Sequence, residues 1–108
     1  MQDSSIALVM VTAPSHDAAD RIVTAVVEEQ LAACGNIVPG LTSIYRWEGA
    51  VQRDAEVLII FKTTRAVLAQ LMTRIEELHP YDVPEVIALP VAAGLEAYMT
   101  WVAGNVHG

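Results

Sequence analysis

One short segment holds most of the side chains that could do chemistry. Residues 79–85, with the sequence HPYDVPE, place an imidazole, a phenol and two carboxylates between and beside two prolines. An imidazole next to carboxylates can bind a divalent cation or transfer protons, so His79 could serve as a metal ligand or, with Asp82 or Glu85, as an acid/base pair. The alternative is a stiff connection whose path the prolines fix. With no second histidine or cysteine close by, the spacing favours the structural interpretation and leaves His79 a weak metal candidate.

A second cluster, Tyr45-Arg46-Trp47-Glu48, stands just before the turn signal Glu48-Gly49-Ala50. Tyr, Trp and Arg are enriched at the anchors of protein interfaces. The same residues also make ordinary cross-strand pairs in a sheet. The sequence favours an interface between like subunits over a site for a foreign ligand.

The other reactive side chains carry weaker signals. Cys34 is the only cysteine, which excludes an intramolecular disulfide, and it is expected to be a packed, inert thiol. His16 and His107 have no partner at ligand spacing and are expected at the surface. Lys62 ends an apolar run, but no glycine-rich loop precedes it, so a phosphate-binding loop is excluded.

Composition excludes several classes of protein. The net charge is −7, from 6 basic and 13 acidic residues, and no basic cluster exists that could bind nucleic acid. The longest apolar run is far shorter than the roughly 20 residues that span a bilayer. No basic, cleavable leader opens the chain, which predicts a cytoplasmic protein. Hydrophobic residues reach 54% and charged residues only 18%, against about 25% in ordinary domains, so some apolar surface is expected to face another subunit.

The periodicity predicts one α+β domain over residues 1–108. An apolar strand at 6–12 is followed by a helix that Ser15 caps and that runs through Leu31. A strand at 42–48 turns into a longer strand with Val51, Val57 and Phe61 on one face. The remaining elements are a helix capped by Thr64, a strand at 86–91, and a terminal helix with one apolar side, made of Leu95, Tyr98, Met99 and Val102. This βαββαβ order is ferredoxin-like, with helices on one face of an antiparallel sheet.

Several runs resemble one known family, the CutA divalent-cation tolerance proteins. The similarity lies in LAAC at 31–34, NIVPG at 36–40 and TSIYRWEG at 42–49, and it continues in EV at 56–57, KT at 62–63, HPY at 79–81 and VPE at 83–85. TAP at 12–14 and the closing Tyr98 and Trp101 also match. The order and spacing of these runs cover nearly the whole chain.

The resemblance implies a ferredoxin-like subunit whose long hairpins interlock in a homotrimer, with the architecture of the PII signalling proteins. It implies a role in tolerance to copper and other divalent cations, with no established catalysis. The alternative is a scaffolding trimer that binds a protein or a small molecule. Six residues are expected to line clefts between subunits: Tyr45, Trp47, Glu48, Lys62, Tyr81 and Glu85.

The copper ligands proposed for some members are a cysteine just before the Thr-Ala-Pro turn and two adjacent histidines before Pro-Tyr. Here those positions hold Val11, Leu78 and His79. Apolar side chains cannot coordinate copper, and one imidazole is less than a selective site requires. Copper binding is therefore expected to be weak, or to use ligands from several subunits.

Overall fold

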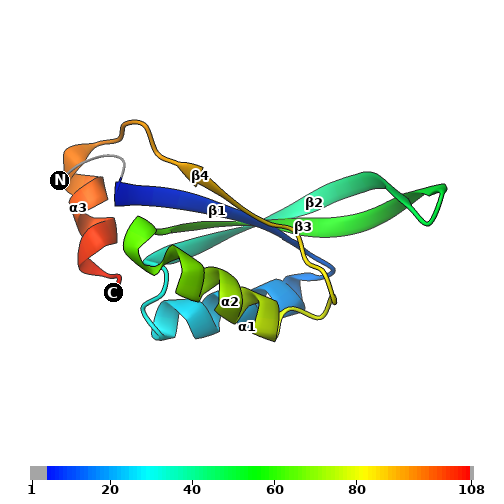
Figure 1. Cartoon of the computed structure of the whole chain (residues 1–108), viewed down its shortest axis with the longest axis horizontal. Helices are drawn as coiled ribbons and strands as arrows, with labels where there is room; N and C mark the ends of the chain where they lie inside the picture. Colours follow the sequence, from blue (N-terminus) through cyan, green and yellow to red (C-terminus); the bar gives the residue numbers. More distant parts are fainter. Residues whose placement is uncertain (1–4, 108) are drawn as a thin grey trace.

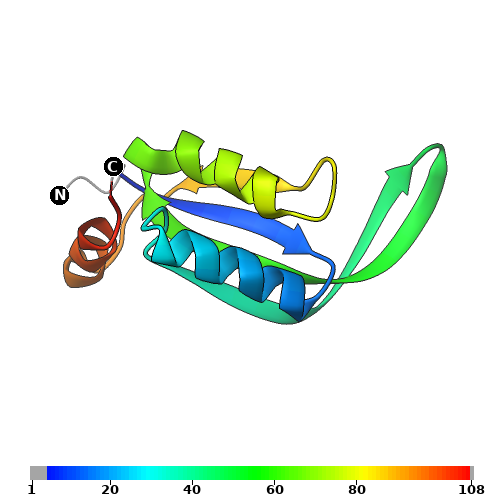
Figure 2. The ribbon, with the colours of Figure 1, turned by 90° about the horizontal axis from the view of Figure 1, so that it is seen from below.

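The chain folds into a four-stranded antiparallel sheet with helices packed on one face (Figures 1 and 2), as the ferredoxin-like prediction requires. A computed structural model describes residues 5–107, so most of the N-terminal segment used to predict the absence of a leader lies outside the described residues. The strand order is β2-β3-β1-β4. In chain order the elements are β1 (Ile6–Ala13), α1 (His16–Glu28), β2 (Cys34–Trp47), β3 (Ala50–Thr64), a 3₁₀ turn (Arg65–Val67), α2 (Leu68–Leu78), β4 (Val86–Pro90) and α3 (Glu96–Gly104).

The main core lies between the sheet and the helices α1 and α2, which run side by side across it (Figure 2). Strand alternation sends every second side chain of the sheet into this layer. The fully buried members come from β1, β3 and both helices: Val9, Val11, Ile22, Val26, Ile59, Phe61, Leu71 and Ile75. A smaller cluster around Met99 and Val102 fastens α3 to the end of the sheet far from the hairpin tip.

Helix α1 begins where the sequence predicts and ends earlier. The Ser15 hydroxyl accepts a hydrogen bond from the Ala18 N–H at 3.1 Å, as a helix-capping serine should. The helix ends at Glu28 and does not run through Leu31. Gln30 adopts a left-handed φ of 61°, and the Leu31 N–H returns to the carbonyl of Val26 at 2.9 Å. This is a Schellman ending, which a sequence without glycine at that position does not reveal.

Replacing Ser15 with alanine removes that cap, and we expect it to lower the free energy of unfolding by about 1 kcal/mol. Urea unfolding at fixed protein concentration measures the change. Ser15→Asp is the control, because aspartate also caps helices and should restore most of the loss. Equal losses in both variants would contradict a capping role.

Strand β2 is longer than predicted. It begins at Cys34, not at residue 42, because Gly35, Pro39 and Gly40 do not break it. A Cβ on Gly35 would lie 3.1 Å from the ring of Phe61, so glycine there permits close approach of strand and core. The pairing with β3 shifts register between Val38 and Leu41, where Gly40 takes a φ of 83°. The Pro-Gly pair is therefore a bulge within the strand.

Three further predictions are corrected at the chain's later elements. The side chain of Thr64 makes no capping hydrogen bond, and a 3₁₀ turn separates it from α2. In the terminal segment only Met99 and Val102 are buried, while Leu95 precedes the helix and Leu95 and Tyr98 are exposed. Strand β4 ends at Pro90, one residue before the predicted end.

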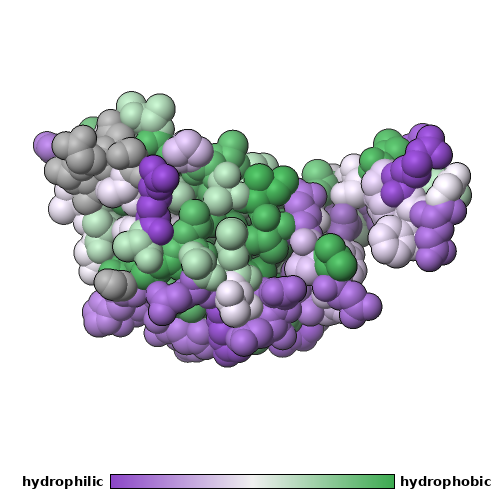
Figure 3. Space-filling view, viewed as in Figure 1, coloured by the Kyte–Doolittle hydropathy of each residue, from purple (hydrophilic) through white to green (hydrophobic). Residues whose placement is uncertain are grey.

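The β2–β3 hairpin extends well past the helices, along the longest dimension of a molecule that measures 46 × 25 × 23 Å (Figure 1). Val51 shares its face of β3 with Val57 and Phe61 by alternation, and it is 60% exposed because the hairpin has left the body by that point. No helix of residues 5–107 covers the other side of the sheet. Apolar side chains gather there, and we call them the open sheet face: Leu8, Met10, Leu58, Ile60, Ile87 and Leu89. Figure 3 shows hydrophobic surface over the strands, next to the hydrophilic layer of the helices.

Candidate functional site

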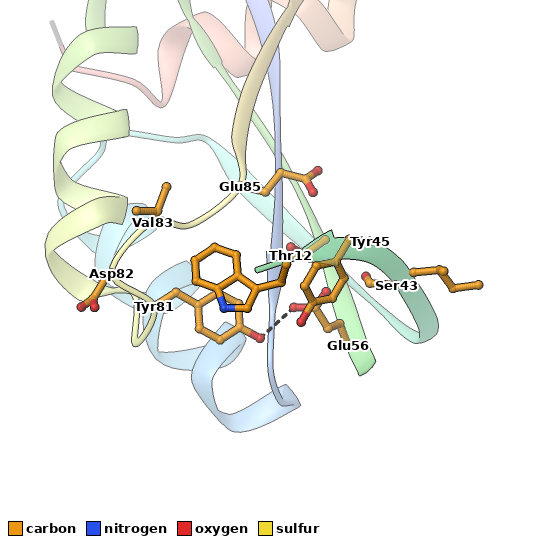
Figure 4. Close-up of a pocket in the computed structure, with 10 residues that line it drawn as sticks. Thr12, Ser43, Tyr45, Glu56, Tyr81, Asp82, Val83 and Glu85 are labelled. Atoms are coloured by element: carbon orange, nitrogen blue, oxygen red, sulfur yellow. Dashed lines mark hydrogen bonds between the residues drawn. The ribbon is translucent and has the colours of Figure 1, made fainter. Parts of the chain in front are cut away.

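A cleft of about 590 Å³ opens where the hairpin leaves the body, between its strands and the connection from α2 to β4 (Figure 4). Thr12 and Glu56 reach it from β1 and β3, on the same side of the sheet as the open sheet face. The cleft therefore continues that apolar surface at its hairpin end. The lining residues are Thr12, Ser43, Ile44, Tyr45, Trp47, Glu56, Tyr81, Asp82, Val83 and Glu85.

Two phenol–carboxylate pairs organise the cleft. The hydroxyl of Tyr81 donates to Oε2 of Glu56 at 2.8 Å, so the connection is tied to β3 (Figure 4). The hydroxyl of Tyr45 donates to Oδ2 of Asp54 across the hairpin. The β2–β3 register explains the second pair, since Tyr45 lies opposite Gln52 and on the same face as Asp54 and Glu56.

Burial raises the pKa of Tyr81 to about 12, with further increases from its hydrogen bond to Glu56 and from the negative charges of Glu56 and Asp54. The pKa of Tyr45 is raised in the same direction, chiefly because its proton is held by Asp54. Both phenols therefore stay neutral near pH 7 and remain donors.

Spectrophotometric titration of tyrosinate should show these effects. Because the folded-state pKa of Tyr81 lies above its value of 10.0 in the unfolded chain, its stabilising contribution is complete below pH 10 and is lost as the pH rises toward 12. We expect the native protein to ionise a tyrosine near pH 12 and Tyr81→Phe to remove that step. A Tyr81 midpoint at or below pH 10 would contradict the Tyr81–Glu56 contact.

His79 is buried and has structural partners on both ring nitrogens. The backbone N–H of Tyr81 donates to Nδ1 at 3.1 Å, so Nε2 carries the proton and donates to the Thr12 carbonyl at 2.7 Å. The ring fastens the connection to the end of β1, and a metal would have to displace one of these bonds. These contacts favour the structural interpretation of the segment. Within residues 5–107 no three His, Cys, Asp or Glu side chains gather closely enough to hold an ion.

The structure brings together four of the six residues expected to line a cleft, namely Tyr45, Trp47, Tyr81 and Glu85. Glu48 is instead at the hairpin turn, with a φ of 49°. Lys62 is near the other end of β3, where its amine donates to Oδ1 of Asn36.

Sequence reasoning did not select Glu56 or Thr12 as cleft residues. Glu56 could have been found from strand alternation, because it lies on the same face of the hairpin as Tyr45, which was predicted to line a cleft. Thr12 could not, because only the fold brings the end of β1 to the cleft. Its carbonyl bond to His79 is equally invisible in the sequence.

Cys34 differs from the packed thiol that was expected. It is half-buried at the start of β2, and its Sγ lies 3.7 Å from the hydroxyl of Tyr98. Tyr98 in turn stacks on Trp101, with ring centroids 5.6 Å apart. The predictions for His16 and His107 are confirmed, since both are exposed.

Comparison with known proteins agrees with this geometry. The family model described as CutA1 divalent ion tolerance protein matches residues 7–105. The chain belongs to the CutA1 divalent ion tolerance family. A solved Thermus thermophilus divalent cation tolerance protein superimposes with a TM-score of 0.92 at 50% identity, covering 94% of this chain and 99% of that one. The solved CutA1 of Oryza sativa gives a TM-score of 0.93 at 45% identity, covering 95% of this chain and 94% of that one.

The CutA relatives differ in length. The chain is 52% identical to the divalent-cation tolerance protein CutA of Thermus thermophilus over 91% of this chain and 95% of that protein. It is 47% identical to the chloroplastic CutA of Arabidopsis thaliana, again over 91% of this chain, but it spans only 54% of that protein. The shared part is thus the domain described above.

The structure also locates two of the positions that the family resemblance suggested for copper ligands. Val11 is fully buried on the helix side of β1, and Leu78 packs against the same core. Neither side chain lines the cleft. These positions serve packing in this chain.

Proposed function

We propose that the chain is a homotrimeric divalent-cation response protein without a catalytic role, and that cations bind at the cleft. The observation that carries the proposal is the charge of the cleft wall. Glu56, Asp82 and Glu85 line it, and none of its lining residues is basic. Carboxylate oxygens in such a setting attract divalent cations.

The open sheet face supports assembly into an oligomer. It carries exposed Ile87 and Leu89 beside half-buried apolar neighbours, and a surface of this kind is typical of an interface. The projecting hairpin offers a second contact, with Trp47 and Val51 exposed on it. Because the cleft adjoins both surfaces, neighbouring subunits would form part of its walls.

Shared ligands explain how a cation could be held. Since no complete ligand set gathers in the described residues of one subunit, we propose that carboxylates from adjacent subunits complete it. This includes copper, for which His79 stays the weak candidate. A PII-like signalling role would follow if occupied clefts change the surface that the trimer presents to partners.

Alternative functions have less support. The contacts of His79 occupy the nitrogens that an acid/base enzyme would use.

No helix in residues 5–107 has the length and apolarity needed to cross a membrane. A cytoplasmic location stays a prediction, because relatives are named as chloroplastic in Arabidopsis thaliana and as periplasmic in Archaeoglobus fulgidus.

Titration of Glu85→Gln with zinc and cupric ions tests the proposed site. We expect the affinity to fall about tenfold or more, because one charged oxygen ligand is lost while the fold is kept. Glu76→Gln is the matched control, since Glu76 is exposed on α2 and does not line the cleft. Unchanged affinity in Glu85→Gln, with unchanged mass by light scattering, would overturn the assignment.

A further inference from the structure

The cleft has aromatic walls as well as acidic ones. Tyr45, Trp47 and Tyr81 line it and keep 42%, 59% and 37% of their surface exposed. Figure 4 shows the phenol of Tyr81 directed at the Glu56 carboxylate, to which its hydroxyl donates a hydrogen bond. Aromatic faces gathered around a negative charge attract cations by their quadrupoles as well as by the charge itself.

The basic side chains of the hairpin do not line the cleft. Arg46 pairs with Val51, and strand alternation turns this pair away from the face of Tyr45 and Glu56. Arg53 pairs with Ile44, which reaches the cleft although Arg53 does not. Arg46 also donates to the carbonyl of Gly49 at the turn. The arginine side chains of the hairpin are therefore not part of the cleft wall.

The phenols restrict the kind of cation that suits one subunit. Oε2 of Glu56 already accepts from Tyr81, and Oδ2 of Asp54 accepts from Tyr45. A metal ion needs several oxygens directly, whereas one oxygen of each of these carboxylates already accepts a hydrogen bond from a phenol. A cation that carries no N–H donor and is weakly hydrated needs only the charge and the aromatic faces, which remain available.

We propose that the cleft binds a small quaternary ammonium cation between Tyr45, Trp47 and Tyr81, with Glu56 as the counter-charge. The cavity of about 590 Å³ lies within the range of about 300 to 1,000 Å³ typical of small-molecule sites. This ligand class goes beyond the proposed divalent-cation role, with which it shares the cleft, and it requires no metal.

The test is calorimetric titration of the full chain with tetramethylammonium chloride, with tert-butanol as a neutral molecule of similar shape. We expect saturable binding of tetramethylammonium and at least about tenfold weaker binding of tert-butanol. Trp47→Ala and Glu56→Gln should each weaken the ammonium binding about tenfold. Trp101→Ala is the matched control and should leave it unchanged, because Trp101 does not line the cleft.

Equal affinity for the two probes, no binding, or binding that survives both cleft substitutions would overturn the inference. Zinc titration and light scattering on the same sample separate it from the proposed function. Zinc binding by an intact trimer without ammonium binding would overturn the quaternary-ammonium proposal and leave the divalent-cation proposal standing. Ammonium binding that is weakened by both cleft substitutions, in a protein that does not bind zinc, would support the quaternary-ammonium proposal and count against the divalent-cation role.

Discussion

Replacing Ile87 with aspartate is expected to convert the proposed homotrimer into folded single chains. Ile87 is 52% exposed on β4, beside Met10 on the open sheet face, so a charge there costs a single chain little. In a trimer the same substitution buries one unpaired carboxylate for each subunit, and each costs several kcal/mol. Light scattering should therefore fall from three times the 11.7 kDa of one chain to that mass itself.

Thr73→Glu is the control for this change, because it adds a charge to the exposed side of α2 on the other layer of the molecule. It should leave the mass unchanged. Circular dichroism should show that Ile87→Asp keeps its secondary structure. A trimer that tolerates Ile87→Asp would show that the open sheet face is not the interface.

Replacing Phe61 with alanine is expected to cause the largest loss of stability. Phe61 is fully buried on β3, between the sheet and the helices. Truncating a buried phenylalanine typically costs about 3 to 5 kcal/mol, because apolar contacts are lost and a cavity remains. Urea unfolding in the Ile87→Asp background measures this in a single chain, where assembly does not add to the result.

Val51→Ala is the matched control on the same strand. Val51 shares the core-side face of β3 by alternation but is exposed on the hairpin, so its truncation should change the free energy of unfolding by no more than about 0.5 kcal/mol. A loss below about 1 kcal/mol for Phe61→Ala would contradict the described core.

The contrast between Val51 and Phe61 shows what the sequence predicts and what it does not. Alternation correctly assigns both residues to one face of β3. The polar residues that precede Leu58 and Ile60 also predict a solvated tip and a buried base for this strand. The residue at which the body of the protein ends is not predicted, because it depends on the lengths of α1 and α2 packed across the sheet. The same kind of information is missing for β2, where Gly35 and the Pro39-Gly40 pair are typical strand breakers but are accommodated by close packing and a bulge.

The residues of the candidate site likewise include some whose position the sequence predicts and some whose position it does not. The turn at Glu48-Gly49 fixes the hairpin register, and from it the sharing of one face by Tyr45, Asp54 and Glu56 could be predicted. The approach of the 79–85 connection to that face could not, because it depends on the buried hydrogen bonds of His79. Selecting Tyr81 and Glu85 therefore depended on family resemblance.

Isothermal titration of the purified protein with zinc and cupric ions, with its mass followed by light scattering, tests most directly whether the cleft binds divalent cations. We expect saturable binding that is weakened by raising the salt concentration and by Glu85→Gln, in a sample whose mass is three times that of one chain. An intact trimer that binds neither ion would contradict a divalent-cation role for the cleft.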